Sequence, residues 1–419
     1  MSTHKIRYTT LADDVSGAAD ACYCLTQLAY ACVLTLQPEH VSPEKDGSET
    51  IYIGVTNDRG LRGDALVERW ARWKHFVQQG LQQGEMILKI DSLGRGSWPE
   101  RLQQILALNE APQMTLLLPA IPPAGRTTVG GYQLLDGVSL DQTEAAHDPT
   151  SPVMSAYMPE LARKACEDVR VLSLQDVRQG PQHISAVLRS AIASDAARIV
   201  MVADAETLDD IRALIRGVRI AHVSPLWVGA TSLIEMLVEA EVQQMSEQPA
   251  PAPAFRSMVN KPTLYVVGSL SPIVRQELNV MHVPMVYIVP GLGLVDEENN
   301  LQDTASDRDL AALTRLQGDS YIWEEVLATV HATIDKLFSA RSWGLIVATG
   351  GDTTAAVVEG LQGWGLQLIS KVNVGTVLGT ILGGPYEGFP LVTKVGSMGS
   401  LRILPSKTTD TSTSAIREE

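Results

Sequence analysis

Two acidic residues follow the first apolar run of the sequence, at the point where a strand is expected to end. Asp13 and Asp14 stand directly after Ile6–Leu11 and just before a helical pattern. Ligands of open α/β sheets bind at the carboxyl edge of the strands, so this pair is a candidate for the functional site. Paired acids at a helix start could instead serve only as an N-cap, and that alternative stays open.

A second group of charges follows the fourth predicted strand, and a further arginine follows the third. Arginine offers a planar fork for a carboxylate or phosphate, and carboxylates accept hydrogen bonds from sugar hydroxyls. Together these side chains predict a site for a polyhydroxylated anion, although solvated loop charges would have the same pattern. The candidate substrate-binding residues are Arg59, Lys89, Asp91, Ser92 and Arg95.

Arg126 comes after the fifth predicted strand, behind a turn rich in proline. Prolines fix the backbone of such a turn and hold Arg126 near the same edge of the sheet. Its side chain could join the anion site or brace the loop, and the sequence does not choose between these roles. We include it among the candidate substrate-binding residues.

Glycine-rich turns in the second half of the chain resemble phosphate-binding helix starts. Each joins a predicted strand to a helix, whose free N–H groups and dipole attract phosphate. Neither main turn ends in the Gly-Lys-Ser/Thr of a Walker A loop, and either alone could be an ordinary connection. The residues of these turns and of the last glycine-rich segment that could lie against a phosphate are Ser269, Ser271, Gly350, Gly351, Asp352, Thr353 and Gly396. Gly291–Asp296 lacks the third glycine of a dinucleotide loop, so we discount nicotinamide binding there.

The spacing of the four cysteines does not indicate a metal site. Cys22 and Cys24 lack the two-residue gap of a zinc or redox pair, and burial in a helix explains such thiols. The metal ligands, if any, are unknown from the sequence.

Short β-branched runs alternate with helical spacing along the chain, which is typical of a parallel sheet covered by helices. We therefore predict an α/β fold of two doubly wound domains with mainly parallel sheets and an interdomain cleft. A Pro/Ala-rich segment interrupts the pattern and predicts a spacer. The predicted division is a first domain at 1–241, a linker at 242–262, a second domain at 263–405 and a flexible tail at 406–419. Predicted strands include 32–36, 51–55, 86–90, 114–118, 169–174 and 198–203 in the first half, and 263–267, 285–289, 345–348, 366–369 and 391–395 in the second.

The composition restricts the class of partner. The formal net charge is −15 at pH 7, and no basic stripe is available for nucleic acid, so we expect no nucleic-acid partner. No stretch approaches the length of a membrane span, and the first residues lack the apolar core of a secretion signal. We expect a cytoplasmic protein without membrane contact, and a homo-oligomer is compatible with the sequence.

Read together, these motifs resemble those of the four-carbon acid sugar kinase family, in the same order along both halves of the chain. The resemblance rests on several segments. They are Ala12–Asp20, Asn57–Arg59, Pro119–Arg126, Asp204–Thr207, Gly268–Pro272, Thr349–Thr353 and Lys394–Gly399. Two segments depart from the family pattern: Leu93 and Gly94 stand in the loop after Asp91, where the family has a Thr hydroxyl, and residues 229–234 differ in side-chain size.

The resemblance implies an ATP-dependent kinase that uses Mg²⁺ and phosphorylates the terminal hydroxyl of a four-carbon acid sugar. D-threonate is favoured, followed by D-erythronate or 3-oxo-tetronate. The first domain would hold the sugar acid and the second would hold ATP. On this hypothesis Arg59 and Arg95 bind the acid group, Lys89 supports the site, and Asp13 or Asp14 accepts the proton. Asp352 would help to hold Mg²⁺ or would only cap its helix.

A protein of different class also fits the altered loop at Leu93 and Gly94. A non-catalytic protein derived from the kinase would bind nucleotide or sugar acid without turnover. An oxidoreductase would require a nicotinamide site that the sequence does not contain.

Overall fold

The computed structural model describes residues 8–28, 31–41, 50–148, 151–194, 196–243, 245, 261–268, 272–290, 293–295, 308–314, 323–340, 342–396 and 400–401. Ser269, Ser271, residues 246–260 of the predicted linker and the predicted tail lie outside the described residues. Within the described part, no helix has both the length and the apolar character needed to cross a membrane.

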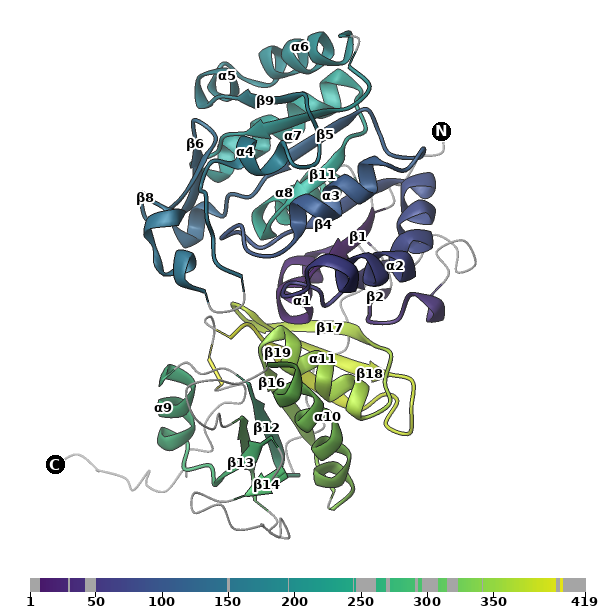
Figure 1. The fold of residues 1–419 in the computed structure, drawn as a ribbon, viewed down its shortest axis with the longest axis vertical. Coiled ribbons are helices and arrows are strands. Elements are labelled where there is room, and N and C mark those ends of the chain that lie inside the picture. The colour runs from purple at the N-terminus through teal and green to yellow at the C-terminus, as the bar shows by residue number, and fades with distance from the viewer. Residues whose placement is uncertain are drawn as a thin grey trace, which may run out of the picture.

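The N-terminal half contains a parallel sheet of eight strands in the order β2-β3-β1-β4-β11-β5-β10-β9 (Figure 1). The strands are apolar on both faces because helices cover both. They are β1 (Tyr8–Ala12), β2 (Ala31–Thr35), β3 (Thr50–Val55), β4 (Glu85–Lys89), β5 (Met114–Leu118), β9 (Val169–Leu172), β10 (Ile199–Ala203) and β11 (Leu226–Gly229).

Two helical layers enclose this sheet. Their buried side chains belong to separate apolar clusters on the two faces. One layer contains α1 (Val15–Cys22), α6 (Pro181–Ile192), α7 (Leu208–Ala221) and α8 (Thr231–Val242), and the other contains α2 (Gly63–Gln83), α3 (Trp98–Leu106) and α4 (Met158–Ala162). The short helix α5 (Leu174–Arg178) packs against α6 and α7, and a small antiparallel sheet is formed by β6 (Arg126–Val129), β7 (Tyr132–Leu135) and β8 (Val138–Ser139).

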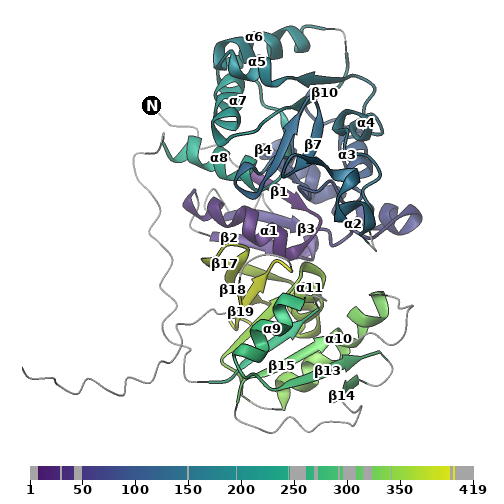
Figure 2. The same ribbon diagram turned by 90° about the vertical axis from the view of Figure 1, so that its left-hand side faces the viewer.

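The C-terminal half has five parallel strands, and antiparallel strands extend the sheet on both sides. Its strands are β12 (Thr263–Val267), β13 (Met285–Val289), β14 (Gly293–Val295), β15 (Leu310–Thr314), β16 (Leu345–Thr349), β17 (Gly365–Asn373), β18 (Thr376–Leu382) and β19 (Pro390–Lys394). Its helices are α9 (Pro272–Val280), α10 (Trp323–Ser339) and α11 (Gly351–Gly360). Figure 2 shows the two halves stacked, with β17 and β18 next to α1 and β2.

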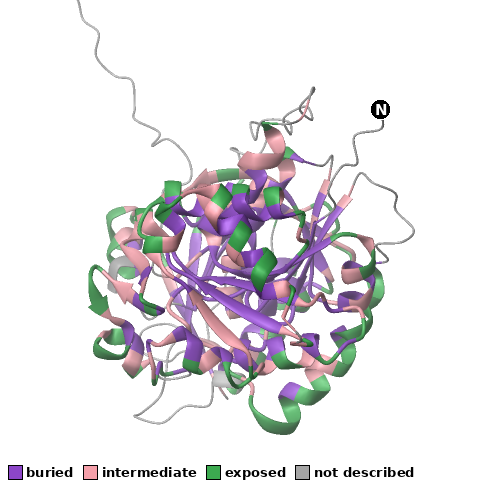
Figure 3. Ribbon diagram, turned by 90° about the horizontal axis from the view of Figure 1, so that it is seen from above, coloured by how far each residue is buried: buried purple, intermediate pink, exposed green. Residues whose placement is uncertain are grey.

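The predicted α/β class with a mainly parallel sheet and covering helices is confirmed. The sheets of the two halves are nevertheless joined, because β17 pairs antiparallel with β2 through Leu366 and Leu34, and within the described residues they make one sheet of sixteen strands. One apolar cluster runs through this joint and contains side chains of both halves. Seen from above, buried strands fill the centre and the exposed residues lie mainly on the outer helices (Figure 3). The domain boundaries stay a prediction.

The joint between the halves leaves no room for a side chain at Gly365. An ideal Cβ there would lie 2.2 Å from the carbonyl oxygen of Leu34. We predict that Gly365→Ala lowers the free energy of unfolding by about 1–3 kcal/mol, because the paired strands must move apart. Urea unfolding of the wild type and the variant measures this difference in the free energy of unfolding. Gly60→Ala is the control, because a Cβ at Gly60 meets no atom within 4 Å. Equal midpoints for the two variants would contradict close packing at the joint.

Candidate active site

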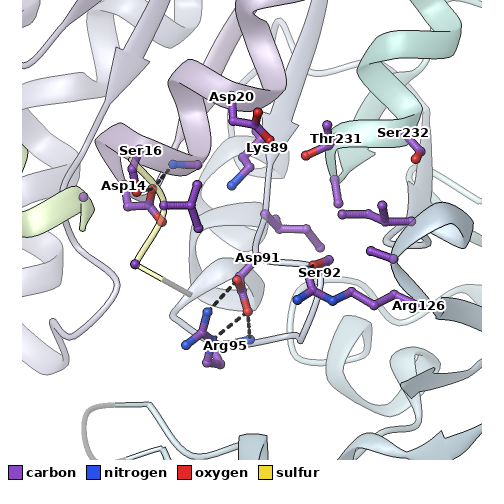
Figure 4. Close-up of a pocket in the computed structure, with 18 of the residues that line it drawn as sticks. Asp14, Ser16, Asp20, Lys89, Asp91, Ser92, Arg95, Arg126, Thr231 and Ser232 are labelled. Carbon is purple, nitrogen blue, oxygen red and sulfur yellow. Dashed lines mark hydrogen bonds and ion pairs between the residues drawn. The ribbon is translucent and has the colours of Figure 1, made fainter. Parts of the chain in front are cut away.

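A cavity of about 620 Å³ lies between the two halves, at the carboxyl ends of β1, β4 and β11 (Figure 4). The predicted site residues that line it are Asp14, Arg59, Lys89, Asp91, Ser92, Arg95, Arg126, Gly350, Gly351, Asp352 and Gly396. The structure thus brings together candidates from both halves of the sequence. Asp13 and Thr353 are buried behind the lining.

Asp14 begins α1 and also faces the cavity. Its backbone is extended, and its carboxylate accepts a hydrogen bond from the Gly17 N–H at 2.5 Å. A Cβ at Gly17 would lie 2.5 Å from Lys89 Nζ and 2.8 Å from Asp14 Oδ1, so only glycine fits at this close approach. The N-cap interpretation is therefore correct for Asp14, and it does not exclude a role in the cavity.

Arg59 connects the carboxylates at the ends of β1 and β4. Its Nε lies 2.7 Å from Asp13 Oδ2, and its Nη2 pairs with Asp14 and lies 3.9 Å from Asp91 Oδ1. The loop after β3 that carries Arg59 is anchored by a buried ion pair between Asp58 and Arg101 at 3.0 Å. One guanidinium therefore compensates three acidic groups at once.

This compensation keeps the buried acids ionised. Burial by itself would raise the pKa of Asp13, but the charges of Arg59 and Lys89 outweigh it and lower the pKa to about 2. Burial likewise opposes ionisation of Asp91, while Arg95 and Arg59 hold the pKa of that carboxyl far below its usual range. The three carboxylates conversely raise the pKa of Arg59 against its burial.

The turn after β4 folds around the Asp91 carboxylate. Arg95 donates to both oxygens of Asp91 at 2.9 Å and to Asp148 at 3.0 Å. The Leu93 N–H also donates to Asp91, at 3.2 Å, and Gly94 has a φ of +73°, a left-handed conformation that glycine adopts without strain. The turn that departs from the family pattern is thus completed by backbone and arginine donors.

Two cations of the cavity have few partners. Lys89 is 5% exposed, and its charge lowers the pKa of Asp13 and Asp91, although no direct ion pair joins it to them in the described part of the chain. Arg126 donates from Nη1 to Ser92 Oγ at 2.5 Å, and its buried Nε has no partner in the described part of the chain. Burial lowers the pKa of Arg126. The side chain of Arg126 thus lines the cavity, and its part in binding an anion stays a prediction.

The C-terminal wall of the cavity presents mainly backbone. Gly350 precedes α11 with a φ of +91°, and no side chain caps this helix. A Cβ on Gly351 would lie 2.8 Å from Asp14 Cβ, so the start of α11 touches the acidic end of β1. Thr353 packs beneath Gly268, where a Cβ would meet its hydroxyl at 1.8 Å.

Several cavity residues were not predicted from the sequence: Ser16, Asp20, Thr231, Ser232, Glu235 and Lys371. Asp20 accepts from Lys371 Nζ at 3.0 Å and from the Gly375 N–H at 3.1 Å, so it ties α1 to the β17–β18 turn. Thr231 and Ser232 begin α8 directly after β11. Their position directly after a short apolar run that ends in Gly229 is the signal that could have identified them.

A metal site made of protein ligands alone is not present in the described residues, which contain no group of three or more His, Cys, Asp or Glu side chains placed to hold an ion. Asp14 and Asp352 both line the cavity. Since Mg²⁺ at nucleotide sites is held by one or two carboxylates together with phosphates, this donor set fits an ion that arrives with a nucleotide.

We predict that Arg59→Met lowers the free energy of unfolding by about 3–5 kcal/mol at pH 7, because it leaves buried carboxylates without their cation. Urea unfolding of Arg170→Met is the control: Arg170 forms a surface pair with Asp168, and its loss should cost less than about 1 kcal/mol.

The effect of Arg59→Met should depend on pH. Because the pKa of Asp13 is lowered, its stabilising contribution is present above about pH 4 and is lost as the pH falls towards 2. The difference between wild type and Arg59→Met should therefore shrink over this acidic range. A difference that stays constant would show that the ion pairs do not contribute to stability.

Comparison with known proteins finds one family model in each half of the chain. A model of a sugar-binding N-terminal domain matches residues 8–237, and a model of a nucleotide-binding C-terminal domain matches residues 294–404. Two crystal structures, one from Salmonella typhimurium and one from Haemophilus influenzae, share the fold. Their TM-scores are 0.71 and 0.67 at 18% and 17% identity, over 95% and 94% of this chain and 97% and 98% of theirs.

Curated relatives align along most of both chains. The D-threonate kinase of Cupriavidus necator is 28% identical over 93% of this chain and 94% of its own. The D-erythronate kinase of Heliobacterium modesticaldum is 24% identical over 93% of each chain, and the 3-oxo-tetronate kinase of Brucella melitensis is 24% identical over 95% and 94%. The match of the sugar-binding domain covers more than half of the sequence. The chain therefore belongs to the four-carbon acid sugar kinase family, whose members are phosphotransferases.

Proposed function

We propose that this kinase transfers the γ-phosphoryl group of ATP to the terminal hydroxyl of a four-carbon acid sugar. D-threonate is the favoured acceptor, followed by D-erythronate or a 3-oxo-tetronate. The observation that carries the proposal is the contact between Gly351, at the start of α11, and Asp14, at the end of β1. This contact places the N-terminus of a helix, which is a favourable position for phosphate, beside a carboxylate in the same cavity.

The helix α11 supports binding of the triphosphate. Its first N–H groups have no side-chain cap, and its dipole favours negative charge at this end. Gly350, Gly351 and Gly396 line the cavity without side chains, so phosphate oxygens could approach the backbone closely. Mg²⁺ bound with the nucleotide would neutralise charge on the transferred group, and Asp352 and Asp14 are the carboxylates that line the cavity at the start of α11.

Asp14 is the better candidate for the proton acceptor. Both carboxylates pair with Arg59, but Asp14 lines the cavity, whereas Asp13 is 1% exposed and lies behind the lining. Phosphoryl transfer requires mainly positioning of the attacking hydroxyl. We therefore assign to Asp14 the role of accepting the proton of the attacking hydroxyl, and to Asp13 the role of holding Arg59 in position.

The substrate class is supported by the names of the relatives, which act on D-threonate, D-erythronate and 3-oxo-tetronates. Two of the relatives named as D-threonate kinases are 28% identical to this chain. The loop at Leu93 and Gly94, which motivated the alternative of a non-catalytic binding protein, is ordered around the Asp91 carboxylate by the Leu93 N–H and by Arg95.

We expect Asp14→Asn to lower kcat by about 10²–10⁴-fold, because the amide keeps an acceptor for the helix cap but cannot take up the proton. Steady-state kinetics with ATP and the best acceptor measure this, and an unchanged melting temperature shows that the variant folds. Asp141→Asn, at an exposed position, is the control. A kcat near that of the wild type would remove Asp14 from the mechanism.

The proposed function is tested by ADP release from ATP and Mg²⁺ with D-threonate, D-erythronate and 3-oxo-tetronates as acceptors. We expect turnover with one of them. If none is phosphorylated while ATP still raises the melting temperature, the binding-protein alternative is favoured.

A further inference from the structure

The helix α1 contacts the C-terminal half at both of its ends. At its start, a Cβ on Gly351 would lie 2.8 Å from Asp14 Cβ, so α11 begins against Asp14. In its last turn, Asp20 accepts a hydrogen bond from the Gly375 N–H at 3.1 Å and pairs with Lys371 Nζ at 3.0 Å. Asp14 and Asp20 both line the cavity and stand about 9 Å apart along the helix axis (Figure 4). Two contacts at this separation fix the direction of α1 relative to the C-terminal half, which one contact would not.

The backbone continues the second contact to the start of α11. The Gly375 C=O accepts from the Val395 N–H at 2.8 Å. The carbonyl of that peptide group, which belongs to Lys394, accepts from the Gly350 N–H at 2.8 Å. Gly350 lines the cavity and directly precedes α11. A short series of hydrogen bonds therefore leads from the Asp20 carboxylate to the glycine wall of the cavity.

The dipole of α1 does not favour a carboxylate at Asp20. An acidic side chain in the last turn of a helix opposes the helix dipole, whereas a cation would be favourable there. The side chain of Asp20 is 11% exposed, and its partners Lys371 and Gly375 both belong to the C-terminal half. The contacts of Asp20 therefore serve the joint across the cavity and not the helix that carries it.

We propose that Asp20 is a positioning residue for phosphoryl transfer, which holds α1, and with it Asp14, in line with the start of α11. The inference rests on the proposed function, which puts the attacking hydroxyl at Asp14 and the γ-phosphoryl group at α11. Phosphoryl transfer depends mainly on the alignment of these two groups, and a displacement of about 1 Å can lower the rate by about 100-fold. Asp20 touches neither reactant in this role and acts through the position of α1.

Substitutions separate the two interactions of Asp20. Asp20→Ala removes both, and we expect kcat to fall about 10–100-fold, with KM for ATP and for the acceptor changed less than about threefold, because each half of the site stays intact. Asp20→Asn keeps an oxygen that accepts from the Gly375 N–H, so its kcat should fall less than about tenfold. Lys371→Met should match Asp20→Asn, because both variants lose only the ion pair.

The double variant Asp20→Asn/Lys371→Met tests whether the two residues act as one unit. We expect its kcat to equal that of either single variant, because the same ion pair is already lost in each. If Lys371 instead bound an anionic group of a reactant, its loss in the Asp20→Asn background would raise a KM and lower kcat further, and the inference would be overturned. A wild-type kcat in Asp20→Ala would overturn it as well.

The matched control is Asp168→Asn, because Asp168 also pairs with a basic side chain, Arg170, but lies outside the cavity. Its kcat and KM should equal those of the wild type. Melting temperatures identify variants that do not fold. If Asp20→Ala is among them, Asp20→Asn, Lys371→Met and the double variant retain the test.

Hydrogen exchange tests the same inference without an acceptor, so it separates this inference from failure of the proposed function, in which the wild type phosphorylates no four-carbon acid. In Asp20→Ala, peptides that contain the N–H groups of Gly375, Val395 and Gly350 should exchange at least about threefold faster than in the wild type, because the joint opens more often. Lys371→Met, with a smaller increase, takes its place if Asp20→Ala does not fold. Asp168→Asn should leave the exchange unchanged. Unchanged exchange at Gly350 in the Asp20 or Lys371 variant would overturn the inference, whether or not an acid is phosphorylated.

Discussion

The geometry of the cavity depends on one guanidinium group that balances several buried carboxylates. Without Arg59, the acids that follow β1 and β4 would repel each other in a region with little water. With it, the start of α1 and the turn around Asp91 are fixed relative to one another. Because Gly351 touches Asp14, the position of α11 is fixed by the same charge balance.

The two walls of the cavity use different chemistry. The N-terminal wall consists of charged side chains at strand ends, whereas the C-terminal wall offers glycine backbone at the start of a helix. Side chains can distinguish the hydroxyl and acid groups of a small substrate, while backbone N–H groups suit the phosphates that all nucleotides share. The division therefore follows what each ligand requires for recognition.

Sequence reasoning identified the strand ends because parallel strands must present their carboxyl ends at one edge. It could not identify which charges neutralise each other, so Arg59 and Arg95 seemed available to a ligand. Thr231 and Ser232 were missed because β11 has only four residues and was not predicted as a strand. Lys371 lies within the antiparallel strand β17, where the rule about carboxyl ends does not apply. The pairing of β17 with β2 joins residues so distant in sequence that no local pattern encodes it.

The joint between β2 and β17 also has a consequence for biosynthesis. The N-terminal half leaves the ribosome first, and until β17 is made the edge of β2 carries unpaired backbone N–H and C=O groups. An open edge of this kind can pair with strands of other chains and begin aggregation. Strand β17, which is made late, therefore covers an edge that the first residues of the chain leave open.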